Sequence, residues 1–284
     1  MSSSRRTSRP GGRRAWRFDV SGLPQLPQLK GVFVTGTDTE VGKTLIAGAI
    51  ARNLRQAGRD VEVFKPVASG CRRGREGLIS SDAEFLAACA DSKRPLAEIT
   101  PVRYRPALAP NVAAERTGRP VDLEAIFDAY RRLEGACECV VVEGVGGLLC
   151  PLDDRFWVIH FARMTGLPVV VVARGGLGTI NHTLLTIHAA RGAGLHVAGV
   201  IVNRYSVEAA LHKSLAAGEA KKAGDADIAM LTNPRQIADR GDVEVLALVP
   251  DDPHSSVEKV RIGRGVRFAV DQVNWASLCG LSGH

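Results

Sequence analysis

Short apolar runs recur along the chain, separated by segments in which apolar residues follow a helical spacing. Several of the runs are continuously apolar and β-branched, with no alternation of polar positions. Strands of that composition are covered on both faces, as in a parallel sheet. The pattern predicts six strands: residues 31–35, 61–64, 139–143, 168–173, 197–202 and 243–249.

Helical spacing fills most of the intervals between these strands. Helices are predicted over residues 43–57, 81–90, 121–134, 155–165, 179–192 and 206–222. Regular strand–helix alternation indicates an α/β fold, doubly wound, with a mainly parallel sheet and helices on both faces. Ligands of such sheets bind at the carboxyl ends of the strands, so functional residues are expected there.

The first predicted strand runs into a Gly-containing loop, residues 35–44, that ends in Gly-Lys-Thr and opens a helix. Strand, loop and helix in this order predict a phosphate-binding P-loop and a P-loop NTPase-like fold. Backbone N–H groups and the helix dipole would hold the anion, Lys43 would add charge, and the Thr44 hydroxyl could bind Mg²⁺. Gly36 lies one residue earlier than in the usual motif, so an ordinary strand-to-helix turn is the alternative.

Other predicted strands also end in polar residues. Glu143 follows a buried strand, as the Mg²⁺-binding acid of P-loop enzymes does. Asp82 by itself fits the acidic first turn of a helix, with Ser81 and Glu84 as a capping box. Lys65 ends the second strand and points toward the P-loop crevice, although alone it could be an ordinary surface lysine.

The later strand ends predict a carboxylate site and a base pocket. Residues 174–178 are Gly-rich and precede a helix, which suits a carboxylate, or a plain connection with Thr179 as the N-cap. Asn203 could offer its amide to a purine edge, and Pro250 could line the same pocket. Residues 101–120 carry four prolines and predict an irregular segment, whereas residues 233–234 predict a helix start and 240–241 a helix end.

Charge is concentrated at the amino terminus. The net charge is +7, but residues 1–18 hold six arginines and no acid, which leaves +1 for the remainder. We expect residues 1–28 to be a basic disordered tail and linker, and residues 29–284 to be a single P-loop domain. A targeting peptide or a weak polyanion contact are the alternatives for the tail.

The six cysteines form no C-x-x-C pair and have no histidines at zinc spacing. With no apolar run of membrane-spanning length, the sequence predicts a cytoplasmic enzyme with no membrane partner.

Taken together, these motifs resemble the dethiobiotin synthetase family, in which the early Gly and the Thr-Asp-Thr-Glu insert are the usual form of the loop. Five segments carry the resemblance: residues 35–44, 65–70, 81–83, 143–147 and 177–182. The resemblance implies an ATP-dependent cyclo-ligase of biotin biosynthesis that uses Mg²⁺. Its substrates would be 7,8-diaminononanoate, CO₂ and ATP, joined through a phosphorylated carbamate.

The resemblance also implies roles for individual residues. Lys65, Lys43 and Thr39 would be catalytic, and Thr44, Asp82 and Glu143 would hold the metal. ATP would be bound by residues of the loop and of the later strand ends: Thr37, Asp38, Glu40, Val41, Gly42, Lys43, Thr44, Glu143, Asn203 and Pro250. Glu40 could also orient an amine or contact the metal. Substrate would be bound by Thr39, Lys65, Ser69, Gly178, Thr179, Ile180 and Asn181.

In this family the active site spans a homodimer, and the helix start at residues 178–181 receives the substrate carboxylate from the partner's site. Arg174 departs from the family pattern, as do the basic tail and the long carboxyl-terminal portion. Two alternative functions are a partition-type switch ATPase and an ATP-dependent amide-forming enzyme. The first predicts a second lysine in residues 36–41 and a basic body, and the second a nucleophilic cysteine elbow, none of which is present. The nearly neutral body also argues against nucleic acid as a partner.

Overall fold

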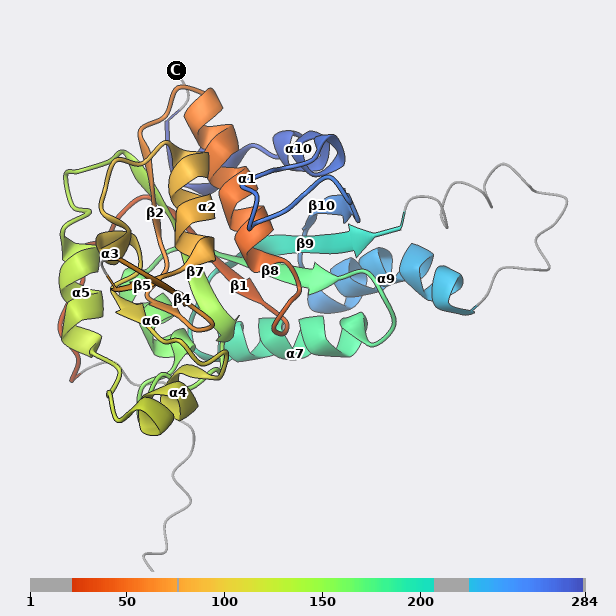
Figure 1. Ribbon diagram of the computed structural model, residues 1–284. Helices are drawn as coiled ribbons and strands as arrows, with labels where there is room; N and C mark the ends of the chain where they lie inside the picture. Colours follow the sequence, from red (N-terminus) through yellow and green to blue (C-terminus); the bar gives the residue numbers. More distant parts are fainter. Residues whose placement is uncertain (1–21, 76, 207–224, 283–284) are drawn as a thin grey trace, which may run out of the picture.

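The computed structural model describes residues 22–75, 77–206 and 225–282, and is built around a sheet of six parallel strands (Figure 1). The strands lie in the order β10-β9-β8-β1-β7-β2. Their bounds are β1 (Gly31–Gly36), β2 (Val61–Phe64), β7 (Cys139–Gly147), β8 (Val169–Arg174), β9 (Val197–Tyr205) and β10 (Val245–Pro250). All six predicted strands and the doubly wound architecture are confirmed.

Helices cover both faces of this sheet (Figure 1). One face carries α1 (Lys43–Gln56), α2 (Ser81–Ala90), α10 (Arg264–Asp271) and α11 (Trp275–Leu278). The other carries α5 (Leu123–Arg131), α6 (Val158–Thr165), α7 (Thr179–Gly192) and α9 (Asp225–Gly241). Strand β1 shows why a continuous apolar run is needed: Val32 and Val34 pack with α1, while Phe33 between them packs with the opposite layer.

Smaller elements lie over the end of the sheet near β2. Strand β3 (Val67–Ala68) pairs with β6 (Val102–Arg103), and β4 (Arg72–Gly74) pairs with β5 (Gly77–Ile79). Helices α3 (Leu96–Ile99) and α4 (Pro110–Thr117) complete this region. The expectation of an irregular segment over residues 101–120 was therefore wrong in part. Pro110 starts α4 at the first helical position, where its missing N–H leaves no hydrogen bond unmade.

Two helix starts differ from the expectation. Ser80, not Ser81, caps α2, because its Oγ accepts a hydrogen bond from Ala83 N at 3.2 Å. Helix α9 begins at Asp225 and contains Pro234, so residues 233–234 do not start it, although it ends at Gly241 as predicted. The helix expected over residues 206–222 lies, apart from its first residue, outside the described part of the chain.

Residues 22–30 form no helix or strand, but they are packed on the domain. Leu26 is buried in the core, and Gln28 Nε2 donates a hydrogen bond to Met164 O at 3.2 Å. The basic tail falls on residues 1–21, outside the described residues. Within the described residues, no helix is long and apolar enough to cross a membrane.

Candidate active site

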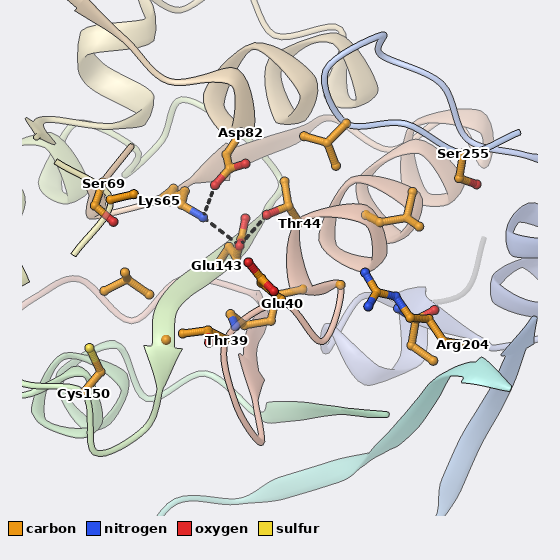
Figure 2. Close-up of a pocket in the computed structure, with 18 of the residues that line it drawn as sticks. Thr39, Glu40, Thr44, Lys65, Ser69, Asp82, Glu143, Cys150, Arg204 and Ser255 are labelled. Carbon is orange, nitrogen blue, oxygen red and sulfur yellow. Dashed lines mark hydrogen bonds and ion pairs between the residues drawn. The ribbon is translucent and has the colours of Figure 1, made fainter. Parts of the chain in front are cut away.

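The carboxyl ends of the strands open into a cavity of about 800 Å³. Because β1 lies between β7 and β8, the loop after β1 meets the polar end of β7. Many of the residues predicted for the site line this cavity: Thr39, Glu40, Gly42, Lys43, Thr44, Lys65, Ser69, Asp82, Glu143, Asn203 and Pro250. Figure 2 shows Ser69 and Cys150 toward one end of it and Arg204 and Ser255 toward the other.

The P-loop presents free backbone donors. Helix α1 starts after Gly42, which adopts φ 93 and has no side chain to cap the first N–H groups. Those groups are therefore available to an anion. Lys43 is buried and donates to Asp38 O at 2.8 Å, and burial lowers its pKa more than nearby carboxylates raise it. Glu40 adopts a φ of 57, a backbone conformation that residues other than glycine rarely adopt and that is often found at functional sites.

A buried ion cluster lies beside the P-loop (Figure 2). Lys65 Nζ contacts Asp82 Oδ2 and Glu143 Oε1, each at 2.7 Å. The hydroxyl of Thr44 donates to the same Glu143 oxygen at 2.8 Å. These residues come from α1, α2, β7 and the loop after β2, so the sheet order itself assembles the cluster.

Burial sets the protonation of this cluster. Lys65 is 4% exposed and Glu143 only 1% exposed. Burial alone would lower the pKa of Lys65, but the carboxylates of Glu143 and Asp82 outweigh it and raise that pKa above its ordinary value. Burial also raises the pKa of Glu143, and the Lys65 ammonium opposes that rise. Lys65 is therefore held charged in a place where an isolated ammonium would be costly.

The cluster can accept a divalent cation. Glu143 Oε2 is buried and has no hydrogen-bond partner among the described residues. With Thr44 Oγ1 and Asp82, it offers the oxygen ligands that Mg²⁺ prefers. No group of three His, Cys, Asp or Glu side chains in the described ranges could hold a metal ion. Mg²⁺ here would need phosphate oxygens or water to complete its shell, as it usually does at nucleotide sites.

Comparison with known proteins identifies the family. An AAA domain family model matches residues 30–259. An ATP-dependent dethiobiotin synthetase of Anaeromyxobacter dehalogenans is 47% identical over 180 residues, which are 63% of this chain and 79% of the relative. The enzyme of the same name from Anaeromyxobacter sp. (strain K) is 41% identical over 79% of this chain and 92% of the relative. This chain belongs to the dethiobiotin synthetase family. It is an ATP-dependent ligase.

Solved structures agree with the fold of this family member. A ParA family ATPase from Chlorobium tepidum has a TM-score of 0.51 at 13% identity, covering 86% of this chain and 98% of that one. The MinD cell division protein of Aquifex aeolicus also gives 0.51, at 12% identity, covering 90% and 99%. Likeness at this identity concerns the fold alone. The relatives of 41–47% identity therefore decide between the synthetase and the partition-type alternative.

Several residues predicted for the synthetase site lie elsewhere. Thr37 and Asp38 line a separate hollow of about 400 Å³ between the P-loop and α7. Val41 is buried, and its carbonyl accepts a hydrogen bond from Asn203 Nδ2 at 2.8 Å. Asn203 thus fixes the P-loop backbone with the amide that was expected to face a purine. The helix start at residues 178–181 does not line the main cavity.

The sequence interpretation missed part of the cavity wall. The backbone after β10 was expected to line the base pocket, and Asp251 and Asp252 do line the cavity, but residues 255–257, Arg204 and Cys150 were not predicted. The rule that ligands bind at strand ends pointed to all of these positions. Arg204, which adopts φ 54, follows Asn203 directly. Its position next to a residue predicted for the site was the one indication in the sequence that it lines the cavity.

Replacing Gly42 with alanine should weaken nucleotide binding by the synthetase and lower its stability. A Cβ at this position would lie 2.1 Å from Asn203 Nδ2, in a backbone conformation that disfavours side chains. We expect a loss of about 1–3 kcal/mol in stability from strain and a broken loop anchor, together with weaker ATP binding. Thermal unfolding and equilibrium nucleotide binding would measure both. Gly58→Ala is the control, because Gly58 has φ 78 but open space around it. Equal effects of the two changes would contradict the role of the Asn203 contact.

Proposed function

We propose that this enzyme closes the cyclic urea of dethiobiotin on 7,8-diaminononanoate, using CO₂ and ATP. The observation that carries the proposal is the ion cluster beside the P-loop, in which buried Lys65 and Glu143 meet the partly exposed Asp82. A P-loop is common to many ATPases and does not by itself indicate a substrate. Here the ammonium of Lys65, held between two carboxylates at the edge of the loop, adds a second cation besides Lys43. The chain also covers most of the length of relatives named for this activity.

The proposed reaction has three steps that balance. One substrate amine attacks CO₂, and loss of a proton gives a carbamate. A carbamate oxygen then attacks the γ-phosphorus of ATP, the bond to the bridging oxygen breaks, and ADP leaves. Finally the second amine attacks the carbamate carbon and gives up a proton to solvent, the C–O bond to phosphate breaks, and inorganic phosphate leaves as the ring closes.

The chain's own residues divide these tasks. Lys43 and the loop N–H groups would stabilise charge on the transferring phosphoryl group. Lys65, Thr39 and Ser69 would hold and polarise the carbamate, and all three line the cavity. Glu40 projects into the same space and could orient an amine (Figure 2). Holding the reacting groups together would supply much of the rate acceleration.

Mg²⁺ would be held by Thr44, Asp82 and Glu143, and when bound it would neutralise phosphate charge. Glu143 Oε2, which has no hydrogen-bond partner in the part of the chain that the structure describes, would be one of the oxygens that hold it.

The proposal is tested by ADP release. Purified protein with Mg-ATP and bicarbonate should release ADP only when 7,8-diaminononanoate is present, and dethiobiotin should appear in equal amount. The measurement is a coupled ADP assay together with mass spectrometry of the product. ADP release at the same rate without the diamine would reject the proposed function.

The proposal includes a homodimer in which residues 178–181 receive the carboxylate of substrate bound to the partner. Two observations support it. Helix α7 starts after Gly178 with no side-chain cap, so its first N–H groups can bind an anion. Leu177, in the loop just before this helix, and Leu185, on the helix, leave large apolar side chains exposed by 77% and 59%, as expected of an interface.

Leu185→Glu should separate the subunits. A carboxylate on this face would be buried without a partner in the dimer, so we expect monomers and at least about tenfold lower activity at low protein concentration. Light scattering and the ADP assay measure the two effects. Phe268→Glu is the control, because Phe268 is 71% exposed but lies on α10, away from α7 (Figure 1). A fully active monomeric Leu185→Glu protein would rule out a site shared between subunits.

A further inference from the structure

A second large cavity, of about 770 Å³, lies between α1, the end of α2, α10 and the loop that joins β10 to α10. Figure 1 shows α10 beside α1, on the face of the sheet that they share. The cavity takes basic side chains from three separate segments of the chain: Arg52, His254, Arg261, Arg264 and Arg267. None of these residues has a role in the proposed reaction.

The positive charge in this cavity is not explained by the composition of the chain. Outside the first 18 residues the net charge is only +1, so four arginines around one cavity represent a local concentration. Across the described residues, no acidic side chain forms an ion pair with Arg261, Arg264 or Arg267. Arg52 has only a distant contact with Asp271, at 4.0 Å.

Among the described residues that line the cavity, Asp252 is the one acid, and its carboxylate oxygens accept other hydrogen bonds. Asp252 Oδ1 accepts a hydrogen bond from His254 N, and Oδ2 accepts one from Gly265 N, both at 2.9 Å. The carboxylate therefore caps the start of α10 and shapes the loop. The arginines consequently keep their donors available for a ligand.

The chemistry of the ligand follows from the donors and the space. Guanidinium groups bind phosphate through paired hydrogen bonds, and four of them match more than one phosphate group. A volume of about 770 Å³ fits a small molecule. Nucleic-acid sites follow an extended phosphate backbone along a groove. These arginines surround one concave site, which favours a small molecule over a nucleic acid.

We propose that this cavity binds a small molecule carrying at least two phosphate groups and that its occupant lowers the KM for ATP. The physical link is the segment after β10. Asp252 lines both this cavity and the nucleotide-side cavity, residues 255–257 line the latter, and residues 260–264 line the former. A ligand held by Arg261 and Arg264 would order this segment before ATP arrives, so that ATP would bear less of the ordering cost.

Inorganic tripolyphosphate is the probe for binding. It would be titrated calorimetrically into the full chain saturated with Mg²⁺ and a non-hydrolysable ATP analogue, which occupies the P-loop. We expect one binding site, weakened at least about tenfold in the Arg264→Ala/Arg267→Ala protein, since each lost charge-assisted hydrogen bond is costly. The control is Arg105→Ala/Arg116→Ala, which removes the same charge from exposed positions outside both cavities.

The outcomes separate the possible explanations. The arginines of residues 1–18 are shared by all these proteins, so equal binding to both double variants would assign the probe to the tail and overturn the proposal. Displacement of tripolyphosphate by a short DNA duplex of higher affinity would also overturn it, in favour of a nucleic-acid surface. Binding is read without turnover, so this result does not depend on the proposed reaction.

Coupling is measured from the KM for ATP with and without tripolyphosphate. Both proteins are compared in the presence of tripolyphosphate. Under that condition we expect the KM for ATP of the control protein to be about fivefold lower than that of Arg264→Ala/Arg267→Ala. Competition at the P-loop is the same in both proteins and cancels in the comparison. An identical KM response in both would overturn the effect on ATP.

Discussion

Lys65→Ala should reduce the rate of ring closure by about 10²–10³-fold while leaving ATP binding largely intact, since a preorganised charge at a reacting group contributes on that scale. The ammonium of Lys65 is paired with Glu143 and Asp82, and within the described ranges it donates no hydrogen bond to the P-loop backbone. Loss of its ammonium should therefore affect the carbamate and not the phosphates. Single-turnover kinetics and equilibrium nucleotide binding would separate the two steps.

The same substitution should also lower stability. It leaves Glu143, which is 1% exposed, without its cation, and breaking a buried ion pair from one side costs about 3–5 kcal/mol. The pKa of Glu143 is already raised by burial, so the lone carboxyl group should take up a proton and recover part of that loss. Added Mg²⁺ should recover stability as well, because the freed carboxylates can bind it.

Lys93→Ala is the matched control. Lys93 also pairs with a carboxylate, Asp91, but its side chain is 83% exposed, so its removal should change stability by no more than about 1 kcal/mol. If Lys65→Ala abolished ATP binding while Lys93→Ala did not, the assignment of Lys65 to the carbamate would be wrong.

The sheet could be predicted because its signal is local. The central strands β1, β7 and β8 bury both faces along most of their length, so a continuous β-branched run such as that of β7 has no competing interpretation as an amphipathic element. The position of Glu143 at the end of such a run then placed it beside the P-loop. That inference needs only the rule that strand ends share one edge of the sheet.

The errors arose where a distant contact decides the local structure. Asn233 resembles a helix cap in the sequence, but its Nδ2 donates to Gly175 O at 3.0 Å and Gly176 O at 3.2 Å. With that side chain used to hold the loop after β8, α9 extends through Pro234. Asn203 lines the main cavity as expected, but the bond from its Nδ2 to Val41 O, from a strand far along the chain, had no signal in the sequence. No local pattern reports which partner a buried amide will find.

The basic cavity on α10 shows a different limit of sequence interpretation. Arg52, Arg261, Arg264 and Arg267 are scattered among neutral residues, and only the packing of α10 against α1 brings them together. The sequence shows only the cluster of arginines in residues 1–18, because it reveals charges that are close along the chain. Charges that the fold brings together from distant segments leave no such pattern.

Glu143→Gln should lower kcat by at least about 100-fold, because even partners that only support a metal ligand cost about 10–100-fold in activity when they are lost. The amide keeps an oxygen for Thr44 and Lys65, so the fold should survive. The substitution replaces the second carboxylate oxygen, Oε2, with an NH₂ group and removes the negative charge, and a bound cation requires both. The concentration of Mg²⁺ needed for half-maximal activity should rise at least about tenfold.

Glu138→Gln provides the comparison, because Glu138 lies just before the amino end of the same strand, β7. It pairs with Arg59 at 2.8 Å and is partly exposed, so it resembles Glu143 in having a cationic partner but lies at the opposite end of the sheet. Its Mg²⁺ dependence should not change. An unchanged Mg²⁺ requirement in Glu143→Gln would instead restrict Glu143 to neutralising Lys65. The metal would then have to be held by Thr44 and Asp82 without the carboxylate that β7 places between them.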